Sequence, residues 1–250
     1  MKSRSAAKPS LRWEVSDAWR VYAILLLGVG GFGFSAIFAR AADAPGLIVA
    51  VWRVSVAALL LAVPFAWQPP ALRRLDRATL RRGLLGGTIF AISVASFHIG
   101  LDYTPAANAA FLANVAPVWV GLITRLVLRQ VLPRRFWPGV SVALAGAALI
   151  VFGRGGLTGL QAGDLIVLAN SLIWATYQVY TARSRIHTGA LTWVWLIVTV
   201  SALWLIPLAL LLGYRLVGYS RETTLNMLGA GVVAQAGGFL AFNYVLGHLP

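Results

Sequence analysis

Residues 105–126 read PAANAAFLANVAPVWVGLITRL and residues 136–152 read FWPGVSVALAGAALIVF, with the basic segment VLRQVLPRR between them. A helix that crosses the hydrocarbon core of a bilayer needs about 20 mainly apolar residues. Each run approaches that length, and the arginines of the connecting segment favour the cytoplasmic side of a membrane. The stretch therefore predicts two neighbouring transmembrane helices joined by a short cytoplasmic loop.

The rest of the chain continues this pattern. Of its 250 residues, 59% are hydrophobic and 11% are charged, whereas roughly 25% of the residues of a soluble domain are charged. This composition excludes a soluble globular domain and a disordered chain. We expect an all-α fold, a polytopic membrane helical bundle of about eight transmembrane helices. The candidate spans are residues 21–38, 47–67, 83–101, 105–126, 136–152, 164–180, 191–212 and 225–246.

The basic residues predict the orientation of the chain. There are 21 Lys and Arg against 7 Asp and Glu, a formal net charge of +14. With the N-terminus in the cytoplasm, 16 basic residues fall in the tail and the cytoplasmic loops, and 4 fall outside. This asymmetry is typical of a multi-pass protein of a bacterial-type inner (plasma) membrane. Topology and attraction to anionic membrane lipid then account for the charge, so no nucleic-acid partner is expected.

The N-terminus allows one alternative. A basic start, an apolar run and Ala39-Arg40-Ala41 imitate a signal peptide with its cleavage site. The run is long and Gly-rich and an arginine occupies the middle of the cleavage motif, so we favour a retained first helix.

Two distant segments of the chain are weakly similar. Residues 88–105 align with residues 233–250 at an offset of 145, which pairs Phe97 with Phe242 and Pro105 with Pro250. Because five spans precede the sixth, the second half enters the membrane in the opposite sense, as in the inverted repeats of secondary transporters. We therefore divide the chain into a basic cytoplasmic tail (1–20), a five-helix repeat (21–153) and an incomplete three-helix repeat (163–250).

The stretch from residue 100 to residue 152 resembles the EamA-type transporters of the drug/metabolite transporter superfamily. The shared features are a turn ending in Thr104, a small-residue helix with the central Pro117, a basic loop and a Gly-rich fifth helix. Residues 164–183, with Trp174-Ala175-x-Tyr177, resemble the start of the family's second repeat. Where the family commonly has Gly-Glu after helix four, this chain has Arg129-Gln130.

The resemblance implies ten helices in two inverted repeats and transport of small metabolites by alternating access. Export of amino acids or other amphipathic compounds would be the expected activity. On this comparison the chain lacks helices nine and ten, and a homodimer would be one way to supply them. The alternative is a non-transporting integral membrane scaffold or regulatory protein.

Enzymatic and metal-binding signatures are absent from the sequence. There is no HExxH, GxSxG or P-loop motif, and no Cys. The three histidines, His98, His187 and His248, do not have the spacing of metal ligands. We therefore expect neither an enzyme nor a bound cofactor or metal, and an intramembrane enzyme is disfavoured.

The best candidate for a substrate site is a stripe on the sixth span. Asn170, Trp174, Tyr177 and Gln178 lie at i, i+4, i+7 and i+8, on one face of a helix. Such a face must point to protein or to a wet cavity, because lipid cannot satisfy its polar groups. Amides orient a ligand and aromatic rings supply broad contact. For any one of these residues, a hydrogen bond between helices is the competing interpretation.

Four further residues extend this candidate site. Asn108 and Asn114 lie on the fourth span, about 120° apart around the helix. His98 lies one turn before Asp102, and the two form either a proton-responsive pair or an ordinary helix end. Arg53, within the second span, either extends to the outer headgroups or attracts an anionic substrate group.

Overall fold

The computed structural model describes residues 15–73, 75–152, 159, 161–185 and 188–246. These residues form helices joined by turns and contain no strand, so the predicted all-α fold is confirmed. His187, His248 and most of the basic tail lie outside the described residues. The segment Ala39-Arg40-Ala41, considered above as a cleavage site, lies in the last turn of the first helix.

The first half of the chain contains three long helices followed by a broken one. The long helices are α1 (Val15–Ala41), α2 (Gly46–Trp67) and α3 (Arg77–Asp102). The expected fourth span is divided into α4 (Ala106–Ala113), α5 (Ala116–Leu122) and the π-helical η1 (Ile123–Val127). Pro117 lies in the first turn of α5, where its missing N–H and fixed φ are tolerated, and this explains the break. The fifth span, α6 (Phe136–Phe152), has the predicted bounds.

The second half begins with two continuous helices, α7 (Ala162–Ser184) and α8 (Ala190–Leu211). Pro207 lies inside α8 without ending it. The eighth span consists of α9 (Arg221–Gly229), the π-helical η3 (Ala230–Gly238) and α10 (Phe239–Leu246). A π-helical stretch is rare and often marks a functional position, and the sequence pattern did not predict it.

Six of the described helical segments are long and apolar enough to cross a membrane, judged by length and composition. α6 is apolar but shorter, and α7 is not in this group. α7 is the helix that carries Asp164, Asn170 and Gln178, and these polar residues lower its hydropathy. The structure is thus a polytopic membrane helical bundle.

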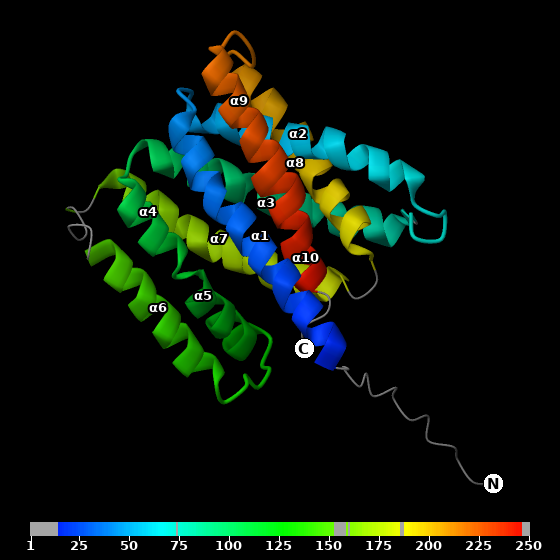
Figure 1. The fold of residues 1–250 in the computed structure, drawn as a ribbon, viewed down its shortest axis with the longest axis vertical. Helices are drawn as coiled ribbons and strands as arrows, with labels where there is room; N and C mark the ends of the chain where they lie inside the picture. The colour runs from blue at the N-terminus through cyan, green and yellow to red at the C-terminus, as the bar shows by residue number, and fades with distance from the viewer. Residues whose placement is uncertain (1–14, 74, 153–158, 160, 186–187, 247–250) are drawn as a thin grey trace.

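The helices pack around α3, α7 and α8. Figure 1 shows α1 running alongside α9 and α10 across the bundle, while α4, α5 and α6 lie together on one side. α7 packs against both α3 and α5, and so it joins the group α4–α6 to the rest of the bundle. The core between α2, α3, α7 and α8 includes the fully buried Ile48, Phe90, Tyr177, Trp193 and Ile197.

Two of the glycines in α1 allow a close helix contact. A Cβ on Gly31 would lie 3.0 Å from Gly238 Cα and 3.2 Å from Val233 O, both in η3. A Cβ on Gly28 would lie 3.2 Å from Gly238 O in η3 and 3.2 Å from Phe242 N in α10. A Cβ on Gly30 would have no atom within 4 Å. Small residues at the contact therefore let the backbones of α1 and η3 approach closely.

Candidate functional site

A cavity of about 430 Å³ lies between α1, α2, α3, α7, α10 and the α4–α5 break. It brings together six of the eight predicted site residues from four segments of the chain: Arg53, His98, Asn114, Asn170, Trp174 and Gln178. The other lining residues are Val29, Ser35, Phe90, Ser93, Val94, Phe97, Ala113 and Phe242. The lining therefore combines a few polar groups with a large apolar and aromatic surface, the composition usual for a small-molecule site.

Arg53 lies in the protein interior. Its side chain is 6% exposed, and its Nε donates to Gln235 Oε1 over 2.6 Å. One of its terminal nitrogens donates to Ser35 Oγ, also over 2.6 Å. These bonds hold the guanidinium against α1 and η3. They exclude the interpretation that Arg53 extends to the outer headgroups, because a snorkelling side chain would leave the bundle.

His98 is buried beside the same cavity, 1% exposed. Its Nδ1 lies 2.8 Å from Val94 O in the preceding turn of α3. A carbonyl oxygen only accepts, so Nδ1 carries the hydrogen. Asp102 is not a partner of His98, because its Oδ2 accepts from Gly46 N over 2.8 Å at the start of α2. The two residues thus do not form the proton-responsive pair considered from the sequence, and Asp102 serves a helix end.

Asn170 is held from the opposite side by α3. Its Oδ1 accepts from Ser93 Oγ over 2.7 Å and from Ser96 Oγ over 3.2 Å. The amide is thereby fixed in orientation at the cavity wall. Gln178, two turns later on α7, is half-buried and also lines the cavity.

Trp174 forms the centre of an aromatic wall. Its ring stacks on Tyr177, with centroids 5.3 Å apart, and lies 6.5 Å from the ring of Phe242. Phe90 lies 6.1 Å away in a tilted arrangement. Tyr177 is fully buried and does not line the cavity, because Phe90 and Phe239 cover it. Its contribution is to support Trp174 from behind.

Asn108 also lies outside the cavity lining. Its Nδ2 donates to both carboxylate oxygens of Asp164, at 3.2 and 3.1 Å. The hydroxyl of Thr104 makes a short hydrogen bond to the same carboxylate. Asn108 in α4 and Thr104 in the preceding turn therefore join this part of the chain to the first turn of α7. Asn114, one turn after Ala110, donates to Ala110 O over 2.7 Å and does line the cavity.

Sequence reasoning missed Ser35 and Gln235, which are hydrogen-bond partners of Arg53. Gln235 is 0% exposed and lies 182 positions from Arg53. A glutamine within an otherwise apolar span is itself a signal, because polar side chains in spans face the bundle interior. No such signal points to Phe97 or Phe242, since an aromatic residue in a span is equally suited to lipid contact.

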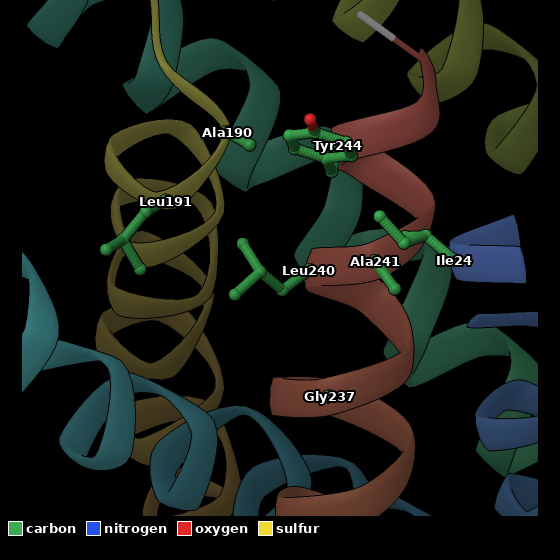
Figure 2. Close-up of a pocket in the computed structure, with 7 residues that line it drawn as sticks. All are labelled: Ile24, Ala190, Leu191, Gly237, Leu240, Ala241 and Tyr244. Carbon is green, nitrogen blue, oxygen red and sulfur yellow. The ribbon is translucent and has the colours of Figure 1, made fainter. Parts of the chain in front are cut away.

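The described residues contain no group of three or more His, Asp or Glu that could hold a metal ion. A second cavity, of about 450 Å³, lies between α1, α8 and the η3–α10 segment. Figure 2 shows Leu240 extending from α10 toward α8, with Ile24 approaching from α1. Its lining is apolar apart from the hydroxyl of Tyr244, and it contains none of the predicted site residues.

Comparison with known proteins identifies the family. The model of the EamA-like transporter family matches residues 19–152, more than half of the chain. The chain belongs to the EamA-like transporter family. As a member of this family, it is a multi-pass membrane transporter.

Relatives of this EamA-like transporter are also named as transporters. An uncharacterized transporter of Archaeoglobus fulgidus is 26% identical over 227 residues, which cover 89% of this chain and 77% of that protein. The uncharacterized transporter YdfC of Bacillus subtilis is 27% identical, over 76% of this chain and 61% of its own length. The uncharacterized transporter YyaM of the same organism is 24% identical, over 80% and 65%. The chain thus spans less than two thirds of the length of the two Bacillus proteins.

The fold of this EamA-like transporter also has a counterpart among solved structures. One crystal structure matches with a TM-score of 0.74 at 16% sequence identity, covering 91% of this chain and 79% of that one. At this identity the likeness shows the fold alone.

Proposed function

We propose that this EamA-like transporter exports small amphipathic metabolites, such as amino acids or related compounds, through the Arg53–Trp174 cavity. The observation that carries the proposal is the cavity lining: a buried guanidinium, an imidazole and an amide face an aromatic wall. Small-molecule sites are usually concave, mostly apolar and equipped with a few fixed polar groups. The volume of about 430 Å³ lies within the usual range for such sites.

Both halves of the chain contribute to the cavity. Arg53 and His98 come from the proposed repeat 21–153, whereas Asn170, Trp174 and Phe242 come from the proposed repeat 163–250. A site between two repeats can open to either side of the membrane when one repeat rocks against the other. The α4–α5 break and η3 are positions where the adjoining helices can bend.

The test is flux through the purified full chain in proteoliposomes, with a panel of labelled amino acids, hydroxy acids and amines. We expect saturable efflux of at least one compound. Trp174→Ala and Asn170→Ala should reduce this efflux by about tenfold or more, because the first removes aromatic contact surface and the second removes an amide group from the cavity lining. Leu172→Ala is the matched control, because Leu172 lies on the same helix, is 41% exposed and is not part of the lining.

The outcomes separate the candidate functions. No saturable flux of any compound from a folded protein would favour the non-transporting scaffold. Saturable flux that is unchanged in Trp174→Ala and Asn170→Ala would place the pathway elsewhere in the bundle.

A further inference from the structure

The cavity carries one fixed positive charge and no negative one among its lining residues. Arg53 is the lining cation, and none of the described side chains that line the cavity is an Asp or a Glu. The two partners described for its guanidinium, Gln235 and Ser35, offer neutral oxygens. In a poorly hydrated site, a fixed charge strongly attracts a ligand of opposite sign and repels one of like sign.

His98 adds an unsatisfied hydrogen-bond acceptor to this positive site. Because Nδ1 donates to Val94 O, the Nε2 of the neutral imidazole is an acceptor. Nε2 is buried and has no hydrogen-bond partner among the described residues. A buried acceptor that lies at a cavity can take its missing hydrogen bond from a donor on a bound ligand.

The aromatic wall completes the description of the ligand. Trp174 packs against both Tyr177 and Phe242, so its ring is held in place and contributes apolar surface to the cavity. Phe90 and Phe97 extend this surface along α3. A flat or bulky apolar group fits such a wall.

We propose that the substrate is a net anion, a small carboxylate with a neighbouring O–H or N–H donor and an apolar side group. Arg53 binds the carboxylate, His98 Nε2 accepts from the donor, and the wall around Trp174 takes the apolar group. A zwitterion is disfavoured, because its ammonium group would enter a cavity whose lining has no carboxylate to receive it. This inference rests on the proposed function and narrows its substrate class from amino acids and related compounds to the related compounds that carry a net negative charge.

Three compounds with the same phenylethyl skeleton test the sign of the charge. At pH 7.5, phenyllactate is an anion, phenylalanine a zwitterion and 2-phenylethylamine a cation. Titration calorimetry with the purified full chain should give the tightest binding for phenyllactate. We expect phenylalanine to bind roughly tenfold or more weakly, and 2-phenylethylamine to show no measurable binding.

Substitutions of Arg53 test which residue sets the preference. Arg53→Gln should weaken phenyllactate binding by about tenfold or more, because it replaces a charge-assisted hydrogen bond by a neutral one. Arg53→Lys keeps the charge and should retain most of the preference for the anion. Arg215→Gln is the matched control, since Arg215 is exposed and lies outside the cavity lining.

A fourth compound tests His98. 3-Phenylpropionate lacks the hydroxyl group of phenyllactate and should bind more weakly to the unmodified protein. In His98→Leu the two carboxylates should bind alike, because the acceptor that distinguishes them is gone. This comparison is internal to each variant and does not depend on how much of the protein is active.

Binding measurements on the unmodified protein are enough to overturn the inference. Equal or tighter binding of phenylalanine or 2-phenylethylamine, or no binding of phenyllactate, would contradict a substrate with net negative charge. If a zwitterion or a cation is transported in proteoliposomes and Trp174→Ala stops that flux, the proposed function holds and only the anion inference fails. If nothing is transported, the proposed function itself fails.

Discussion

Asp164 joins α4 and the turn before it to the start of α7 through a single carboxylate. It accepts from the hydroxyl of Thr104, from the amide of Asn108 and, over 2.8 Å, from the backbone N–H of Gln161. The last bond and the reciprocal one, in which the Gln161 side chain accepts from the backbone N–H of Asp164, form a capping box at the start of α7. Because α7 packs against both α3 and α5, this residue stabilises the junction of the two parts of the bundle.

We predict that Asp164→Ala lowers the Tm of the detergent-solubilised protein by roughly 2–4 °C or more. The substitution leaves the buried donors of Thr104 and Asn108 without their acceptor, which costs more than the lost bonds alone. Thermal unfolding checks this, with Asp43→Ala as the control because Asp43 is exposed. Equal Tm values for the two variants would contradict the structural role of Asp164.

The glycines of α1 allow a test of the close contact between α1 and η3. We predict that Gly31→Ala destabilises the protein by roughly 1–3 kcal/mol, the usual cost of overpacking a close contact. The added methyl group would press on the backbone of η3, which cannot turn away as a side chain can. Gly30→Ala should leave stability unchanged or raise it, since a Cβ there meets nothing within 4 Å.

Chemical denaturation of both variants measures this difference. A lower stability for Gly30→Ala than for Gly31→Ala would mean that α1 presents the other face to η3. The sequence alone could not choose between these neighbours, because all four glycines from Gly28 to Gly33 suit a close helix contact equally well.

The helical elements were largely predictable, and their interruptions were not. The ends of α6 and the extent of α2 and α8 follow from apolar runs bounded by charged or turn residues. Pro117 breaks its span, whereas Pro207 remains inside α8. The sequence does not say whether neighbouring helices satisfy the backbone groups that a proline frees. The nine π-helical residues of η3 carry no local signal of this kind.

The candidate site was likewise predictable only in part. One face of α7 was predicted, and Asn170, Trp174 and Gln178 do line the cavity. Tyr177 lies on that face too, but α3 and α10 cover it. A helical pattern gives the direction in which a side chain points and not what lies opposite it. The contact between Arg53 and Gln235 depends on the packing of α2 against η3, which no spacing along the chain reveals.

The orientation of the whole molecule in the membrane is still a prediction from its charges. The chain has no Cys, so single cysteines can be introduced without removing any. We expect Arg215→Cys to react with a membrane-impermeant maleimide in intact cells. Arg134→Cys should react only after the cells are permeabilised, because the basic loop before α6 should be cytoplasmic. Both side chains are exposed. The reverse labelling pattern would invert the proposed topology.

The placement of Arg53 determines how a membrane voltage would act on the transporter. Gln235 and Ser35 hold the guanidinium at the cavity wall, and we expect its charge to move little across the membrane while a substrate passes. A carboxylate that crosses without a companion ion then moves one elementary charge, worth about 2.3 kcal/mol per 100 mV. An interior-negative potential drives that charge outward. In proteoliposomes with a valinomycin-imposed potassium potential, phenyllactate efflux should accelerate when the interior is negative and slow when it is positive; equal rates would show that the charge is compensated during transport. The voltage that a cell already maintains would thus be enough to give this protein its direction.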